Sequence, residues 1–185
     1  MARAPEINDD PDAPAWSLPD GARIGAVVST FHSQLTRAMC ASAQAELAAA
    51  GLAEEDFLVL EAPGAFELPL IARRLAIRED ISAVLCFGLV LKGETTHDRY
   101  VSDAAARGIL QVSMDTDKPV LFGVLTCDTL EQAKARALPA DEGGDPTRDK
   151  GRELARAAMA TIAALESAAK LGHKPTSMGF PGGLS

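Results

Sequence analysis

The sequence predicts an α/β fold, a three-layer α/β/α sandwich built on a four-stranded parallel sheet. Short apolar runs alternate with longer helical stretches, which is typical of strands and helices packed in layers. The apolar runs are rich in Val, Leu and Ile on both faces, as expected of parallel strands that are buried on both sides. A chain of 185 residues, 47% of them hydrophobic, is long enough for one domain with a sizeable core.

Four strands and five helices are expected. The strands are Ile24–Val28, Phe57–Leu60, Ala83–Leu91 and Val120–Leu125. The helices are about Ser33 to Ala50, Phe66 to Arg78, Asp98 to Thr116, Asp128 to Ala137 and Lys150 to Leu171. Gly51 suits the position after the first helix, and Pro69 is tolerated in the first turn of the second. Asp128 with Glu131 predicts a capping box for the fourth helix.

Three segments lie outside these elements. Residues 1–21 and 172–185 are rich in Pro, Gly and polar residues, which predicts terminal extensions that are mobile or docked on a partner. One domain then spans residues 22–171. Within it, Leu138 to Asp149 is a Pro/Gly/Asp-rich loop between the last two helices.

Composition excludes several classes of function. The net charge is −8 and the Lys and Arg residues are scattered, so no basic stripe is available for a nucleic-acid backbone. No run is long enough to span a bilayer, and residues 1–16 lack the apolar core of a signal peptide; a cytoplasmic protein is expected. Cys40, Cys86 and Cys127 lie in apolar patterns without a C-x-x-C pair, which predicts buried thiols rather than disulfides, zinc ligands or a nucleophile.

Polar and aromatic residues follow each predicted strand. Because parallel strands end at the same edge of a sheet, beside helix amino termini that favour anions, we expect these residues to share one site. Together they suit a flat polar heterocycle, a polyol and a phosphate. The four segments are Thr30–His32, Glu61–Glu67, Lys92–His97 and Thr126–Asp128.

His97 is the candidate catalytic residue. It is one of three histidines, and an imidazole can both give and take protons near neutral pH. The alternative is a helix-start histidine that bonds a neighbouring carboxylate such as Asp98. The glycine and two threonines in the same loop favour the catalytic interpretation.

Other candidates have equally ordinary explanations. Phe31 lies directly beyond a strand end and could stack on a ligand or belong to the core, and the pattern does not choose between them. Glu67 begins a helix, where the dipole favours a carboxylate in any protein. Glu94 with Lys92 could be a surface ion pair.

Arg136 lies at the carboxyl end of its helix, where the dipole alone favours a cation. That helix runs antiparallel to its strand, so at 1.5 Å per residue Arg136 lies about 12 Å below the edge that carries His97. If Arg136 binds a phosphate, it does so in a neighbouring subunit's site. Lys150 has the ordinary interpretation of a solvated lysine at a helix start.

With these residues assembled, the chain resembles the lumazine synthase family. The resemblance runs from about Arg23 to Leu165, and three ordered blocks at family spacing make it specific. The blocks are Pro63–Pro69, Gly88–His97 with Tyr100 and Val101, and Pro119–Thr126 continuing into Glu131–Ala133 and Arg136–Ala137.

The resemblance implies a flavodoxin-like fold and a reaction without metal or organic cofactor. In the family, 5-amino-6-(D-ribitylamino)uracil condenses with 3,4-dihydroxy-2-butanone 4-phosphate to 6,7-dimethyl-8-ribityllumazine. It implies proton transfer by His97, and it implies substrate binding by Phe31, Ala65, Phe66, Glu67, Leu89, Val90, Leu91, Glu94, Thr95, Phe122, Arg136 and Lys150.

The sequence departs from the family in three places. His32 replaces the usual asparagine, the loop Leu138 to Asp149 is longer than in shell-forming members, and the N-terminal extension contains four prolines, which pair poorly with a sheet edge. The resemblance implies the homopentamer common to the family, and these departures favour it over the sixty-subunit shell. The resemblance also implies riboflavin synthase as a further partner. Two alternatives are an archaeal-type riboflavin synthase and a flavin-binding or scaffold paralogue with weak catalysis.

Overall fold

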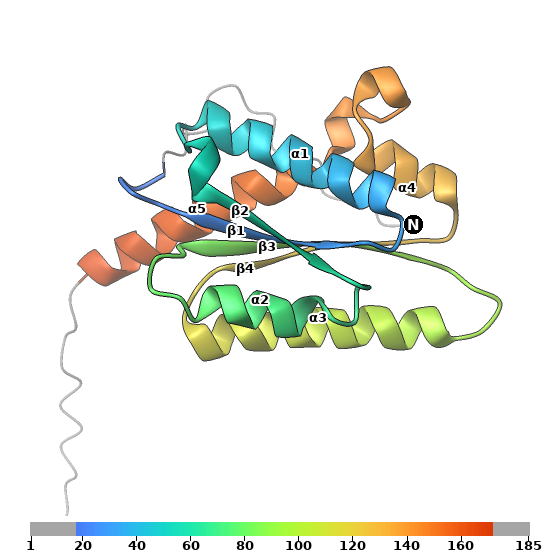
Figure 1. The fold of residues 1–185 in the computed structure, drawn as a ribbon, viewed down its shortest axis with the longest axis horizontal. Coiled ribbons are helices and arrows are strands. Elements are labelled where there is room, and N and C mark those ends of the chain that lie inside the picture. The colour runs from blue at the N-terminus through green and yellow to red at the C-terminus, as the bar shows by residue number, and fades with distance from the viewer. Residues whose placement is uncertain (1–17, 172–185) are drawn as a thin grey trace, which may run out of the picture.

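A computed structural model describes residues 18–171, so the predictions for residues 1–17 and 172–185 lie outside the described residues. Its centre is one sheet in which all four strands are parallel, in the order β2-β1-β3-β4 (Figure 1). This confirms the predicted α/β class and the strand count. The strands are β1 (Ile24–Ser29), β2 (Phe57–Ala62), β3 (Ala83–Leu91) and β4 (Val120–Cys127).

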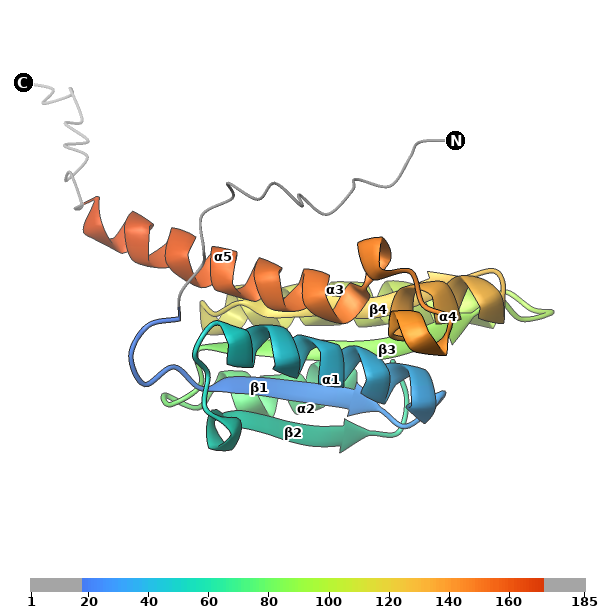
Figure 2. The same ribbon diagram turned by 90° about the horizontal axis from the view of Figure 1, so that it is seen from above.

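Helices cover both faces of this sheet, as predicted. One face carries α1 (Ser33–Ala49), α4 (Leu130–Ala137) and α5 (Lys150–Lys170). The other carries α2 (Leu68–Ala76) and α3 (His97–Thr116) (Figures 1 and 2). Short 3₁₀ turns are η1 (Glu54–Asp56), η2 (Ala140–Glu142) and η3 (Pro146–Arg148), the last two within the predicted loop.

Two hydrophobic cores hold the three layers together. Alternate residues of β1 point to opposite faces, so Val28 joins the core under α1 and α5 while Val27 joins the core over α2 and α3. The first eight residues of β3 are buried, as a central parallel strand requires. The order also places a reversal between β1 and β3, the position where ligands bind in open α/β sheets.

Two predicted helix starts were wrong. The second helix begins at Leu68 rather than Phe66, because Phe66 and Glu67 belong to the loop after β2. The capping box of α4 uses Thr129, not Asp128: the Thr129 hydroxyl accepts from the Gln132 N–H at 3.2 Å. Both pairs have capping spacing, so the sequence alone does not choose between them.

A close helix crossing fixes the start of α5. A Cβ added to Gly151 would lie 2.1 Å from the carbonyl oxygen of Met39, in α1. Only glycine allows the two backbones to approach so closely. The crossing therefore sets the position of the neighbouring Lys150.

The predicted thiols are free and buried. Burial raises the pKa of Cys40 and of Cys86 to about 12, so neither is a ready nucleophile. Among residues 18–171, no helix has the length and apolar character needed to cross a membrane.

Candidate functional site

A cavity of about 610 Å³ opens at the carboxyl edge of the sheet, beside β1 and β3. Three of the four predicted segments meet there: the loops after β1 and β2, and the turn between β3 and α3. The lining residues are Phe31, His32, Gly64, Ala65, Phe66, Glu67, Leu89, Val90, Leu91, Gly93, Thr95, His97, Asp98 and Val101.

Phe31 lies at this cavity and not in the core. The residue is 70% exposed, which leaves most of an aromatic ring in contact with water. The structure thus excludes the core interpretation, while stacking on a ligand stays a prediction. The ring makes an edge-to-face contact with His32, with centroids 6.1 Å apart and planes at 68°.

His32 lines the cavity with an unusual backbone conformation. Its φ of 56° places it in the left-handed region, at the N-cap of α1. Asparagine and histidine are both enriched there among residues other than glycine, so histidine is tolerated at this position.

The loop after β2 is tied to the loop after β1. The Thr30 N–H donates to the Ala62 carbonyl at 2.8 Å, and the Thr30 hydroxyl donates to the Pro63 carbonyl at 3.2 Å. These bonds hold Glu67 at the N-cap of α2 and on the cavity wall. Its carboxylate makes no hydrogen bond within residues 18–171, so its oxygens remain available to a ligand.

The turn before α3 presents His97 at the first position of the helix. The His97 N–H lies 3.4 Å from the Thr95 hydroxyl. Within the described chain, the imidazole has no hydrogen bond or ion pair, so the alternative bond to Asp98 is not formed. Its ring nitrogens are free for proton transfer.

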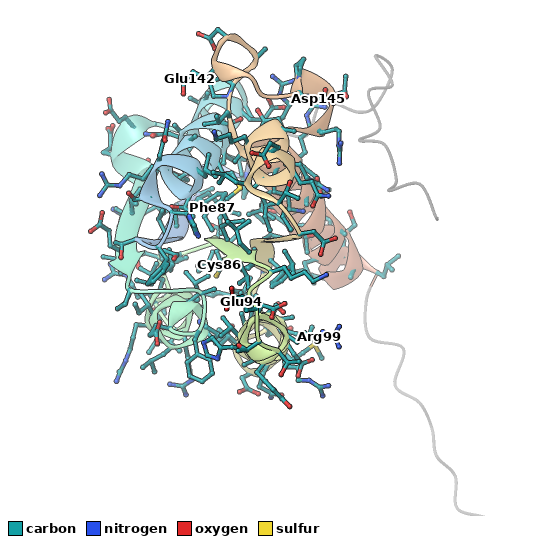
Figure 3. The ribbon with its side chains drawn as sticks, turned by 90° about the vertical axis from the view of Figure 1, so that its right-hand side faces the viewer. Cys86, Phe87, Glu94, Arg99, Glu142 and Asp145 are labelled. Atoms are coloured by element: carbon teal, nitrogen blue, oxygen red, sulfur yellow. The ribbon has the colours of Figure 1, made fainter. Side chains whose placement is uncertain are left out.

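Glu94 is exposed and does not line the cavity, although it lies on the same turn (Figure 3). The surface pair suggested for it is not formed. Lys92 instead pairs with Asp128, with Nζ 3.4 Å from Oδ1. The side chains of Lys92 and Asp128 are largely exposed, so this pair contributes little stability.

Besides Glu94, three more predicted site residues lie outside the cavity lining: Phe122, Arg136 and Lys150. Phe122 is on the edge strand β4 and is 37% exposed. Arg136 and Lys150 lie on the α4 and α5 side and share one carboxylate, that of Glu153. The Arg136 Nη2–Glu153 Oε2 distance is 3.0 Å, and the Lys150 Nζ–Glu153 Oε1 distance is 2.6 Å.

Sequence reasoning missed Glu153. Its only local signal is the spacing of three from Lys150 on one helix, which brings the two side chains onto the same face. The contact with Arg136 joins two helices across 17 positions and is not visible in the sequence. The Arg136 Nε is also buried without a hydrogen-bond partner among the described residues.

The sequence profile of the 6,7-dimethyl-8-ribityllumazine synthase family matches residues 21–166. The chain belongs to this family. The match covers every strand of the sheet and every segment of the cavity wall, in agreement with the resemblance seen in the motifs.

Curated relatives agree with this assignment. The 6,7-dimethyl-8-ribityllumazine synthase of Protochlamydia amoebophila is 37% identical over 156 residues, 84% of this chain and 87% of the relative. That of Salinibacter ruber is 41% identical over 145 residues, 77% of this chain and 89% of the relative. That of Thermus thermophilus is 39% identical over 147 residues, 80% and 90% of the two chains.

Chemically, the cavity offers groups for organic substrates. It combines an aromatic face, a free carboxylate, a free imidazole and the N–H groups at the start of α3. Within residues 18–171, no group of three or more His, Cys, Asp or Glu side chains is arranged to hold a metal ion.

Proposed function

We propose that this chain is a lumazine synthase. It joins 5-amino-6-(D-ribitylamino)uracil to 3,4-dihydroxy-2-butanone 4-phosphate, giving 6,7-dimethyl-8-ribityllumazine, phosphate and water. The observation that carries the proposal is the cavity at the β1/β3 reversal, where Phe31, Glu67 and His97 meet in a chain of this family.

The pyrimidine end of the site lies between β1 and β3. The exposed ring of Phe31 stacks on the pyrimidine, and backbone groups of Leu89, Val90 and Leu91 bond its edge. The ribityl chain lies along Ala65, Phe66 and Glu67, whose free carboxylate accepts hydrogen bonds from hydroxyls. All seven residues are supported in this role by their place at the cavity wall.

The phosphate end lies at the start of α3. N–H groups of Glu94 and Thr95, in the turn that leads into α3, bind the anion, and the amino terminus of α3 favours its negative charge. His97 moves protons during imine formation, phosphate loss and ring closure. Much of the acceleration comes from holding two reactants in contact, since well-oriented groups gain several kcal/mol over free encounter.

A second subunit completes the site. Phe122, Arg136 and Lys150 lie outside the cavity of their own chain, so they act in the neighbouring one, Arg136 and Lys150 on the phosphate. A cyclic homopentamer provides this arrangement. Exposed apolar side chains on α2 and α3 support such contacts; they include Leu70, Tyr100, Leu110 and Met114.

The extended loop between α4 and α5 and the prolines of the N-terminal segment favour the pentamer, alone or paired into a decamer, over a sixty-subunit shell. Light scattering of the purified protein tests this directly. A mass near five or ten subunits is expected, and a mass near sixty would reject the proposal.

Activity is tested by mixing the purified protein with both substrates and following the fluorescent lumazine. Formation that depends on the protein and on both substrates is expected. A protein that binds the lumazine but does not accelerate its formation would instead be the paralogue with weak catalysis. A cytoplasmic location and transfer of the product to riboflavin synthase stay predictions.

A further inference from the structure

The turn before α5 holds Arg148 close to Arg136. The Asp145 N–H donates to the carbonyl of Ala135 at 2.8 Å, one residue before Arg136 on α4. The Arg148 N–H in turn donates to the Asp145 carbonyl at 2.9 Å. The backbone of Arg148 is therefore one 3₁₀ turn away from a residue that is bonded directly to α4. Figure 3 shows Asp145 beyond α4, on the side of the sheet opposite the helix that carries Arg99.

Side-chain hydrogen bonds fix the turn on both sides of Arg148. The Asp145 carboxylate accepts from the Thr147 N–H at 3.0 Å and from its hydroxyl at 2.7 Å. The Asp149 carboxylate caps α5 through the Arg152 N–H at 3.0 Å and accepts from the Ser42 hydroxyl at 2.5 Å. Arg148 thus projects from an ordered turn, which lowers the entropy lost when its side chain binds a ligand.

Arg148 is the third cation of this region. Its charge also reaches Asp145, whose pKa is lowered by hydrogen bonds from Thr147 and, to a smaller extent, by Arg148. Arg136 and Lys150 occupy the two oxygens of Glu153. No carboxylate among residues 18–171 lies within ion-pair distance of Arg148, and its side chain is exposed. Arg136 and Arg148 also act on one neighbour: burial raises the pKa of the Cys127 thiol, while both guanidinium groups lower it.

Arg136, Lys150 and Glu153 together carry too little positive charge to match a phosphate. Arg136 and Lys150 contribute two positive charges and Glu153 removes one, which leaves +1. A phosphate monoester carries about −1.5 to −2 at neutral pH. One more cation brings the group to about the opposite charge, and a guanidinium suits phosphate because it can donate two parallel hydrogen bonds.

We propose that Arg148 is a further phosphate-binding residue, acting with Arg136 and Lys150 on the phosphate of the ketone substrate. This rests on the proposed function for the identity of the ketone. The group itself, Arg136 and Lys150 on one glutamate with Arg148 on the adjoining turn, predicts binding of a phosphate monoester or of inorganic phosphate, whatever the second substrate is.

The first test is binding of inorganic phosphate to the full-length protein, measured by calorimetry without turnover. Arg148→Gln should weaken phosphate binding by about tenfold, the loss expected for one charge-assisted contact. Arg148→Lys keeps the charge but loses the two parallel hydrogen bonds of a guanidinium, so its affinity for phosphate should lie between those of Arg148→Gln and the unmutated protein. Arg152→Gln is the matched control, because it removes the same charge at a position four residues further along the chain. The Arg152 side chain pairs with Glu46 at 3.6 Å, so its loss should change the affinity for phosphate less than about twofold.

The second test is steady-state kinetics with both substrates. Arg148→Gln should raise KM for the phosphorylated ketone by a similar factor and leave KM for the pyrimidine substrate within about twofold. Circular dichroism and the mass of the assembly check folding of each variant. If Arg148→Gln does not fold, the intermediate affinity of Arg148→Lys still tests the proposal.

The outcomes separate the two proposals. Absence of lumazine formation by the unmutated protein would reject the proposed reaction, while the phosphate measurement would still test Arg148. Absence of phosphate binding by the unmutated protein, unchanged affinity in Arg148→Gln, or an equal loss in Arg152→Gln would each overturn the role of Arg148.

Discussion

Arg136 and Glu153 form an ion pair between α4 and α5, with Nη2 3.0 Å from Oε2. The two side chains are only 25% and 37% exposed, so water screens this pair less than a surface pair. Glu153 also holds Lys150, and so keeps two cations together in the absence of an anion. In a phosphate site, the carboxylate holds the cations in place before substrate arrives.

Replacing Glu153 by Gln should destabilise the protein, because it leaves two partly buried cations without a counter-charge. A loss on the order of 1–2 kcal/mol is expected in urea denaturation. Added phosphate should restore part of this loss, whereas chloride at the same ionic strength should not. Equal recovery with both salts would indicate general screening rather than a site.

His97→Ala should lower kcat by about 10²–10⁴-fold, the usual range for general acid–base help. The mass of the assembly and the affinity for a ribityl-pyrimidine analogue should stay close to those of the unmutated protein, because the free imidazole contributes no internal bond. Unchanged turnover would remove the acid–base role. Failure to fold would instead assign His97 a structural role.

Arg136→Ala should mainly impair use of the phosphorylated ketone, since the lost partner is a charge-assisted phosphate contact. Affinity for the ribityl-pyrimidine analogue should change little. Separate saturation curves for the two substrates provide the measurement, and equal losses for both would point to structural damage.

Hybrid assemblies test the shared site. His97→Ala and Arg136→Ala subunits, each with lowered activity, are mixed, unfolded and reassembled, so that some interfaces regain both residues. Partial recovery of activity is expected, and reassembly of each variant alone is the control. If hybrids shown to contain both subunits recover no activity, the shared site is contradicted. His97 and Arg136 would then act in the same subunit's site, or one of them would lie outside the site.

The free energy of unfolding at low pH should depend on Asp80. Hydrogen bonds from Arg78, at 2.9 and 2.8 Å, together with Arg23 lower the pKa of this carboxyl from 3.8 to about 2. A lowered folded-state pKa contributes stability that is present above 3.8 and is lost as the pH falls toward about 2. Asp80→Asn should therefore be less stable than the unmutated protein at neutral pH, and the difference should narrow over that window.

Urea denaturation at a series of pH values measures this difference. Glu79→Gln is the control, because Glu79 makes no hydrogen bond or ion pair within the described residues. A difference between Asp80→Asn and the unmutated protein that is constant from neutral pH to pH 2 would contradict the assignment.

Much of the fold follows from the sequence because its signals are local. The run Ala83–Leu91 predicts β3 with the bounds that the structure has, since a strand buried on both faces must be apolar throughout. Gly51 ends α1 with a φ of 98°, as its freedom at positive φ predicts. Parallel strands end at one edge, so the loops containing Phe31, Glu67 and His97 were expected to meet.

Tertiary structure decided what depends on contacts between distant segments. Three such features depend on elements that are separate in the sequence. They are the exposure of Phe31, the pairing of Lys92 with Asp128, and the ion pair between Glu153 and Arg136. Local propensities differ little in free energy between a core position, a surface ion pair and a helix end for the same residue type. Packing of α4 and α5 against the sheet chooses between them, because burial and the distances between charged groups exist only once the layers have come together.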